Sequence, residues 1–317
     1  MIPSAILSSI SKINSHKKLR PIMYASGPPP PKTKLSITSP YATKTYDYRG
    51  QLHCHTTKSD GVDSPTTIMT AYRNSSYNFC CITDHNVKTA DPGVEGILFI
   101  PGVEETSTLG HIVIVNAISQ NPSATAQTII DTAIANGSFV VLAHPNWVDN
   151  LWTKEEIATI KNFQGIEIWN SGNSNVLSLD KWQNCNEMNR RCFLTVADDT
   201  HDISATPFGT TAVRVFANAL SISEILENLK NGNYYCTYTP TGSSEIIMTV
   251  SIKNNVITVT VNSLSNIYFI GNYDVPLLSG TATTLSYTLT GTEGFVRIYC
   301  ERGPSRSWTN PIYVEVV

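Results

Sequence analysis

The sequence predicts an α/β fold in which a parallel β/α domain is followed by a small antiparallel β-rich domain. Up to Thr239, short apolar runs alternate with helix start and stop signals, a pattern that indicates a parallel sheet or a barrel. From Gly242 onward, short alternating segments rich in Val, Ile, Thr and Tyr indicate an antiparallel β-sandwich. We therefore divide the chain into an N-terminal extension at 1–47, an α/β domain at 48–240 and a β-rich domain at 241–317.

The composition fits a globular protein of one large or two ordinary domains. Of the 317 residues, 41% are hydrophobic and 15% are charged, which is enough apolar material for a core and argues against global disorder. The net charge of −3 argues against a basic nucleic-acid binder, so we consider nucleic acid only as a substrate. The chain has no apolar run of about 18 residues, so we expect no membrane partner.

The cysteines and the N-terminal extension bear on the compartment. Seven cysteines without CxxC spacing favour buried thiols over disulfides, which agrees with a reducing compartment such as the cytoplasm. The first 46 residues contain no Asp or Glu, carry a basic cluster between Lys12 and Arg20, and include the polyproline-forming run Pro28–Pro31. We expect a flexible basic, proline-rich extension, with an organellar transit segment as the alternative.

Apolar runs in the α/β domain predict buried strands. They are Phe79–Thr83, Ile97–Ile100, His111–Val115, Phe139–Ala143, Gly165–Trp169, Phe193–Ala197 and Thr211–Phe216. Helix signals fall between them: Ser64 precedes Pro65 as an N-cap before a proline, and Lys230 precedes Gly232 at a predicted helix end. Two capping boxes mark further helix starts, Thr153 with Glu156 and Ser221 with Glu224.

The β-rich domain shows six alternating segments. They are Ile247–Ile252, Val256–Val261, Asn266–Ile270, Leu285–Leu289, Phe295–Cys300 and Pro311–Val316. The pair Asn254-Asn255 and the glycine Gly291 supply turns between them. This domain contains no histidine, so we expect it to contribute no metal ligand.

Nine histidines and carboxylates are placed where the ends of predicted strands would bring them together. The candidate ligands are His53, His55, Asp60, His85, Glu104, His111, His144, Asp199 and His201. Most of them directly follow an apolar run, and active sites of parallel barrels gather at the C-terminal ends of strands. Residues two apart share one face of a strand, so His53 with His55, and Asp199 with His201, can share a metal.

Imidazole and carboxylate together suit Zn²⁺, Mn²⁺ or Fe²⁺, and several carboxylates allow metals to be bridged. Such metals lower the pKa of a bridging water and create hydroxide near neutral pH, so no serine or cysteine nucleophile is required. The sequence contains no G-x-S-x-G elbow and no P-loop. The pattern therefore predicts a metal-dependent hydrolase. For Asp84 and Asp198, which precede candidate ligands, a supporting role is favoured over ligation.

The ordered motifs resemble those of the PHP family of metal-dependent phosphoesterases. The matching segments are His53-Cys54-His55 through Asp60-Gly61, Thr83-Asp84-His85-Asn86, Ala143-His144-Pro145 and Asp199-Thr200-His201, with Glu104 and His111 between the second and third. The resemblance covers about Tyr48 to Thr239. The segment from Trp308 to Ile312 is similar to the C-terminal β module of the carbaryl-hydrolase-like branch.

This resemblance implies a distorted seven-stranded β/α barrel with two or three divalent ions. It implies three ligand sets: His53, His55, Glu104 and Asp199; Asp60, His85 and His201; and Glu104, His111 and His144. Glu104 is the expected bridge, and Glu104, Asp199 and His201 are the expected catalytic residues. Many relatives carry a histidine where this chain has Asp60, which leaves the metal open between zinc, manganese and iron.

We weigh three functions for this site. The first is hydrolysis of a small-molecule phosphate mono- or diester by a metal-bridging hydroxide, with Arg214 as the candidate substrate contact. The second is hydrolysis of a carboxylic or carbamate ester at the same metals, with an apolar pocket formed by Trp147, Trp152 and Trp169. The third is a degenerate barrel kept as a binding module, against which the intact ligand set argues.

Overall fold

The structure is a computed structural model, and most of the chain beyond residue 33 can be described. The described ranges are 34–41, 46–120, 124–149, 151–172, 176–188, 190–205 and 208–317. The predicted basic cluster and proline run lie outside these ranges. By contacts the chain divides into residues 1–33 and the compact unit Lys34–Val317, which is described below. Within the described ranges, no helix is both long and apolar enough to span a membrane.

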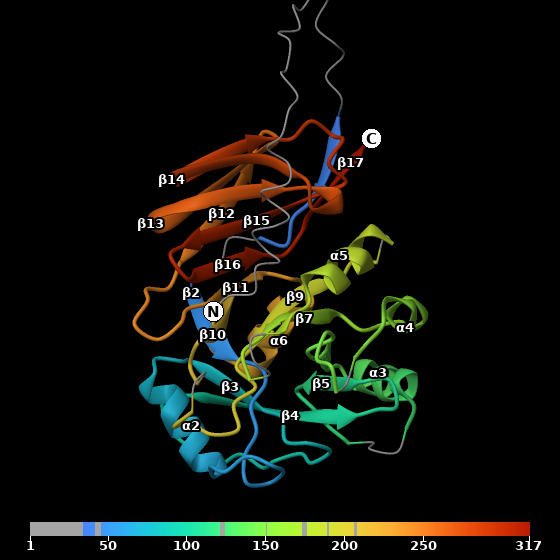
Figure 1. Cartoon of the computed structure of the whole chain (residues 1–317), viewed down its shortest axis with the longest axis vertical. Helices are drawn as coiled ribbons and strands as arrows, with labels where there is room; N and C mark the ends of the chain where they lie inside the picture. Colours follow the sequence, from blue (N-terminus) through green and yellow to red (C-terminus); the bar gives the residue numbers. More distant parts are fainter. Residues whose placement is uncertain are drawn as a thin grey trace, which may run out of the picture. The chain divides into compact units, whose positions relative to one another are not determined.

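The α/β region follows the predicted alternation closely (Figure 1). It contains β2 (Tyr46–Gln51), α2 (Pro65–Asn74), β3 (Phe79–Ile82), β4 (Leu98–Thr106), β5 (His111–Val115), α3 (Ala126–Ala135), β6 (Phe139–Leu142), α4 (Lys154–Thr159), β7 (Gly165–Asn170), β8 (Val176–Leu177), α5 (Leu179–Glu187), β9 (Phe193–Ala197), β10 (Thr211–Ala217), α6 (Ile222–Lys230) and β11 (Tyr234–Tyr238). All seven predicted strands are present. Their ends differ by at most one residue, except that β4 continues to Thr106.

The sheet is mixed, whereas the alternation of strands and helices indicated parallel pairing. The pairs β2–β3, β3–β4, β6–β7 and β7–β9 are parallel, whereas β5 is antiparallel to both of its neighbours and β10 is antiparallel to β2. A parallel pair needs a crossover of a dozen or more residues. Between β4 and β5 the chain has only a tight turn, in which Ser107 Oγ accepts a hydrogen bond from the Gly110 N–H at 3.1 Å.

The first and last strands of this series meet beyond their C-terminal ends. Cys54, after β2, forms a parallel bridge with Thr200, after β9. The His55 N–H donates to the Thr200 carbonyl at 2.8 Å, and the Asp199 N–H donates to the His53 carbonyl at 3.1 Å. The strand series β2–β3–β4–β5–β6–β7–β9 is therefore joined end to end at the side where the candidate ligands lie.

The helix boundaries follow the predicted caps, with one exception. Ser64 caps α2, and the reciprocal capping box of Thr153 and Glu156 starts α4. At α6, Ser221 accepts from the Glu224 N–H as expected, but Glu224 Oε2 accepts from the Asn218 N–H instead of closing the box. After α6, Gly232 has a φ of +71°, the left-handed conformation that a helix end favours in glycine.

The C-terminal region is made of antiparallel strands. It contains β12 (Met248–Lys253), β13 (Val256–Ile270), η1 (Asn272–Asp274), β14 (Pro276–Thr288), β15 (Phe295–Arg302), β16 (Ser305–Thr309) and β17 (Ile312–Val316). Asn254 and Asn255 have φ values of +52° and +62°, as a two-residue hairpin turn requires. Two of the predicted segments belong to one strand, β13. The sequence suggested two because an irregular register between Thr260 and Ser265 interrupts the alternating pattern.

This region is connected to the α/β strands through the sheet. Strand β16, which the sequence did not predict, pairs with β11. Strand β1 (Leu35–Thr38), which falls inside the range assigned to the extension, pairs with β17. The C-terminal strands nevertheless enclose an apolar cluster of their own, around Ile257, Phe269 and Ile298. The two proposed domain boundaries, after residue 47 and after residue 240, stay predictions.

Candidate metal centre

The nine predicted ligands lie together at the joined end of the strands. His53 and His55 follow β2, Asp60 lies in the next loop, His85 follows β3, Glu104 lies on β4, His111 begins β5, His144 follows β6, and Asp199 and His201 follow β9. Four overlapping groups have ligand atoms within 4.8 Å of one another: His55–Asp60–His85–His201, His53–His144–Asp199, His53–His55–Glu104 and His85–Glu104–His111. Among the residues that the structure describes, the C-terminal strands contribute no member to these groups.

Four buried side chains have the spacing of ligands around a single ion. His53 Nε2 lies 3.2 Å from Glu104 Oε2 and 3.3 Å from Asp199 Oδ1. His55 Nε2 lies 3.1 Å from each of the same two oxygens and 3.1 Å from His53 Nε2. Ligands at ~2.0–2.1 Å from a tetrahedral ion are separated by roughly 3.3 Å. These residues, which we call the buried half of the site, fit a divalent cation.

Glu104 also faces a second set of histidines with its other oxygen. Glu104 Oε1 lies 2.9 Å from His111 Nδ1 and 3.0 Å from His144 Nε2. On the Oε2 side, His85 Nδ1 lies at 3.2 Å. One carboxylate therefore stands between separate groups of imidazoles, as a residue that bridges two metals would.

The remaining group, the open half, faces solvent. Asp60 Oδ2 lies 3.3 Å from His201 Nε2 and 3.5 Å from His85 Nε2. The Asp60, His201 and His85 side chains are 52%, 39% and 24% exposed, against 4% or less for each residue of the buried half. Substrate and water can reach the cluster from this side. The His201 Nδ1–H donates to the Asp199 carbonyl at 3.0 Å, which directs the Nε2 lone pair toward Asp60.

The charges of the cluster compensate one another in spite of burial. Burial alone would raise the pKa of Glu104, but the surrounding histidines, His53 first among them, hold it well below its usual range. The pKa of Asp199 is lowered in the same way by His53 and His55. Burial would lower the pKa of His55, yet the same two carboxylates raise it to about 9. The chain thus keeps carboxylate charge in its interior, where a cation would be strongly attracted.

The backbone around the cluster is held in uncommon conformations. His144 and Asp199 have φ values of +27° and +50°, which non-glycine residues adopt rarely and which concentrate at functional sites. Gly172 permits a close approach here, because a Cβ at this position would lie 2.4 Å from the Asp199 carbonyl oxygen. The strand ends are therefore shaped to present these two side chains.

Two residues missed by the sequence analysis support the ligands. Glu167 Oε1 lies 2.7 Å from His53 Nδ1, and Asn170 Nδ2 donates to Asp199 Oδ2 at 3.2 Å. A signal for Glu167 existed, since it is the lone carboxylate within the apolar run Gly165–Trp169. Asn170 follows that run and gave no comparable signal.

Asp84 and Asp198 have the hydrogen bonds of supporting residues. Asp84 Oδ1 accepts from the Thr56 N–H at 2.7 Å and from Ser59 Oγ at 2.9 Å, in the loop that carries Asp60. Asp198 Oδ1 accepts from the Thr211 N–H at 2.8 Å. Burial raises the pKa of Asp198, although these backbone donors oppose the shift. Both carboxylates thus hold the loops that carry ligands.

Arg214, predicted as a substrate contact, is engaged in ion pairs. It lies opposite Arg49 in the β10–β2 register, four positions before His53. Its guanidinium lies 3.1 Å from an Asp47 oxygen and 3.3 Å from Glu245. Two carboxylates thus already compensate its charge, which disfavours Arg214 as a substrate contact.

The three predicted pocket tryptophans differ in position. The Trp147 ring lies 5.0 Å from the His144 ring and 5.9 Å from the His111 ring, measured between centroids. Trp152 is fully buried and donates its indole N–H to the His111 carbonyl at 3.2 Å. Trp169 donates to a serine hydroxyl at 3.1 Å and packs against other aromatic rings. Of the three, Trp147 is therefore the one placed to meet a substrate.

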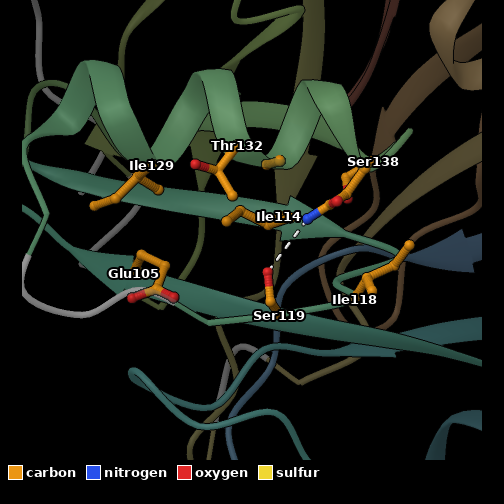
Figure 2. Close-up of a pocket in the computed structure, with 9 residues that line it drawn as sticks. Glu105, Ile114, Ile118, Ser119, Ile129, Thr132 and Ser138 are labelled. Atoms are coloured by element: carbon orange, nitrogen blue, oxygen red, sulfur yellow. Dashed lines mark hydrogen bonds between the residues drawn. The ribbon is translucent and has the colours of Figure 1, made fainter.

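A small cavity lies apart from the metal cluster, between α3 and the strands beneath it (Figure 2). Its volume is about 10 Å³, and its lining includes Ile114, Ile129 and the buried carboxylate Glu105. Glu105 follows Glu104 on β4, and neighbouring residues of a strand point to opposite faces. Glu105 is as buried as Glu104. Because it points to the other face of the strand, it does not belong to the cluster.

The comparisons with known proteins agree with the observed fold. Scans of family profiles and of curated sequences find no match. Among solved structures, a two-domain protein from Bacteroides vulgatus, which contains a predicted PHP-like metal-dependent phosphoesterase, is similar with a TM-score of 0.52 and 18% identity. The match covers 86% of this chain and 95% of that one. The lesion-specific endonuclease EndoQ from Pyrococcus furiosus matches with a TM-score of 0.44 and 17% identity over 59% of this chain and 57% of that one.

Of these two TM-scores, the one for the Bacteroides protein is high enough to indicate a shared fold, and the one for EndoQ is not. At 18% identity that likeness concerns the fold alone. The match covers more of this chain than the α/β region contains, so it reaches into the C-terminal strands. The chain therefore shares the fold of a two-domain protein that contains a PHP-like domain.

Proposed function

We propose that this protein is a metal-dependent phosphoesterase that hydrolyses a small phosphate mono- or diester at a site of two or three divalent ions. The observation that carries the proposal is the position of Glu104, whose two oxygens face separate groups of histidines at 2.9–3.2 Å. A single buried carboxylate surrounded by imidazoles in this way suits the bridging of two ions. Zinc, manganese and iron fit the donor set.

The fold that the resemblance to the PHP family implies supports the same proposal. We infer that β2, β3, β4, β5, β6, β7 and β9 form a distorted seven-stranded β/α barrel, because the two ends of this series are joined at Cys54 and Thr200. We infer that the C-terminal strands form a small β-sandwich domain. The similarity of its Trp308–Ile312 segment to the carbaryl-hydrolase-like branch stays a prediction, as do the domain boundaries 1–47, 48–240 and 241–317.

Each half of the site has a role in this proposal. The metals, when bound, supply Lewis acidity that polarises a phosphoryl oxygen and acidifies water. Glu104 and Asp199 keep their negative charge in the buried half, because neighbouring imidazoles lower their pKa values. His201 presents its Nε2 atom at the exposed edge, where a substrate enters. We retain Glu104, Asp199 and His201 as the proposed catalytic residues.

The charge of the cluster favours an anionic substrate when three ions are present. The carboxylates of Asp60, Glu104, Glu167 and Asp199 together balance two divalent ions. A third ion leaves two positive charges in excess, which a phosphate monoester dianion would neutralise. We therefore expect a phosphate monoester to bind best when three ions are present.

A carboxylic or carbamate ester is the second candidate, and Trp147 favours it. Its indole lies against His111 and His144 and would contact an apolar group bound at the metals. In addition, no Lys or Arg side chain forms an ion pair with the cluster carboxylates among the pairs found in the described residues. A neutral ester needs no such cation.

The proposal is tested by assaying protein of defined metal content against several classes of substrate. The purified protein would be loaded with Mn²⁺ or Zn²⁺ and assayed against phosphate monoesters, phosphate diesters, and carboxylic and carbamate esters. We expect turnover of a phosphate ester that depends on metal and falls with Glu104→Gln. Turnover of the carboxylic or carbamate esters alone would replace the substrate class. Full activity after complete metal removal would overturn the proposal.

The remaining properties stay predictions. We expect a small-molecule partner that carries a phosphate ester, with nucleic acid only as a substrate. A cytoplasmic location stays the expectation from the sequence, with an organellar transit segment as the alternative.

A further inference from the structure

Glu167 occupies a central position beneath the buried half of the site. It lies on β7, between β6 and β9, and is 2% exposed. One of its oxygens, Oε1, lies 2.7 Å from His53 Nδ1. The other, Oε2, accepts from the His144 N–H at 2.9 Å and from Asn170 Nδ2 at 3.1 Å. A single carboxylate thus contacts groups that belong to three strand ends.

Asn170 extends this arrangement to a fourth group. Its Nδ2 atom also donates to Asp199 Oδ2 at 3.2 Å. In a regular strand, Glu167 and Asn170 would point to opposite faces, because they are three residues apart. The pairing of β7 with β9 shifts register between Glu167 and Trp169, and a bulge of this kind re-aims the side chains that follow it. The irregularity allows both residues to face the cluster.

We propose that Glu167, assisted by Asn170, is a positioning residue that selects the tautomer of His53 and sets the approach of His144 and Asp199. This inference depends on the proposed metal-dependent function. With its Nδ1–H donated to Glu167, His53 keeps a lone pair on Nε2, the atom that faces Glu104 and Asp199. A histidine that ligates a metal generally donates its other ring N–H to such a partner.

The chemistry requires a carboxylate at this position rather than an amide. Three donors converge on Glu167: the His53 Nδ1–H, the His144 N–H and the Asn170 amide. Glutamine has one acceptor oxygen and one donor nitrogen. If its oxygen faces His53, its NH₂ group meets two other donors. If its nitrogen faces His53, the ring must place its proton on Nε2, where a metal would bind.

The backbone of His144 gives Glu167 a second role. His144 has a φ of +27°, an uncommon conformation for a residue other than glycine. Such conformations persist when surrounding contacts fix them. The hydrogen bond from the His144 N–H to Glu167 is a contact of this kind, so Glu167 couples the third ligand set to the first.

The experiment compares Glu167→Gln with Glu105→Gln in the full chain. Glu105 is a matched control, because it is equally buried and borders the separate cavity below α3 (Figure 2). Zinc affinity, measured by competition with a chromophoric chelator, should fall ~10–100-fold in Glu167→Gln and change by less than about twofold in Glu105→Gln. Equal zinc affinity in the two variants would overturn the inference.

A second measurement needs no variant and reports the tautomer directly. In zinc-loaded protein labelled with ¹⁵N-histidine, NMR should show His53 protonated on Nδ1. Observation of the Nε2–H form in the wild-type protein would contradict the inference, even if Glu167→Gln fails to fold. Wild-type protein that binds no zinc would instead remove the proposed function. Wild-type protein that binds zinc while Glu167→Gln binds it equally well would remove only the role of Glu167.

Discussion

The two halves of the ligand cluster differ in how deeply the chain encloses them. In the buried half, His53, His55, Glu104 and Asp199 are at most 4% exposed and their donor atoms lie 3.1–3.3 Å apart. In the open half, Asp60 is 52% exposed and its contacts with histidines are 3.3–3.5 Å long. The first half is therefore preorganised for an ion, whereas the second leaves room for exchange and for substrate.

This difference follows from where the residues lie in the fold. In the buried half, Glu104 lies on β4. The other three ligands lie just beyond β2 and β9, in two segments that backbone hydrogen bonds hold together. Asp60 and His201 lie further along the loops after β2 and β9. The loop ends are therefore more exposed than the strand ends. Enclosure at the base and exposure at the edge would suit a site that retains ions and releases product.

The largest effect is expected from Glu104→Gln, which changes the residue of the buried half that also faces His85, His111 and His144. The substitution keeps the size but removes the charge and one acceptor oxygen. We expect loss of bound metal and a fall in turnover of about 10²-fold or more. Elemental analysis and initial rates would measure both. Glu105→Gln, next in the chain, should keep wild-type metal content, and a Glu104→Gln enzyme with full metal and full turnover would contradict the bridging role.

Paired substitutions distinguish the two halves directly. Asp199→Asn should lower the affinity for metal by at least ~100-fold, because the charge is lost from a preorganised buried set. Asp60→Asn should remove one ion with a smaller loss, and millimolar Mn²⁺ should restore it. Calorimetric titration of metal into both variants would give the comparison. If Asp60→Asn were the more damaging change, the assignment of buried and open halves would be wrong.

Metal removal should also proceed in two stages. Chelator should withdraw the ion of the open half first, and that of the buried half only slowly. Since bound metal stabilises the folded state, complete removal should lower the free energy of unfolding by ~4 kcal/mol at a metal concentration of about 1,000 times Kd. Metal release with time and the melting temperature test this prediction. A single fast release phase would show that burial does not separate the two halves.

The smallest effect is expected from Cys54→Ser, although Cys54 lies between two ligands. Its Sγ atom lies 3.5 Å from that of Cys80, on the face of the strand away from the cluster. Burial raises the pKa of Cys54 well above its usual range, which disfavours a thiolate nucleophile. Turnover per folded molecule should change by less than about twofold, with stability lowered by ~1 kcal/mol. Loss of activity with intact metal content would instead indicate thiol catalysis.

Most of the ligands could be predicted from sequence because they lie at or beyond the end of a strand that an apolar run predicts. The apolar runs predict the strands, and the convergence of strand ends then places His85, Glu104, His144 and Asp199 together. The antiparallel course of β5 could not be read from its composition. It depends on the length of the turn before it.

The supporting residues were harder to find because their role depends on pairing rather than on residue type. Asn170 faces the cluster because of a register shift in β7, which no single-sequence pattern reports. Arg214, on β10, forms its ion pairs with Asp47 on β2 and with Glu245, which both lie far from it in the chain. Likewise, β16 was missed because its sequence is mostly polar, and its partner β11 fixes it as a strand.

Anomalous diffraction from crystals grown with Zn²⁺ or Mn²⁺ tests the central claim most directly. We expect two or three anomalous peaks within the cluster. One should lie ~2.0–2.2 Å from His53 Nε2, His55 Nε2 and the nearest oxygens of Glu104 and Asp199, and another on the opposite oxygen of Glu104. Metal-loaded crystals with no anomalous peak among these residues, or with a single ion that does not touch Glu104, would contradict the account.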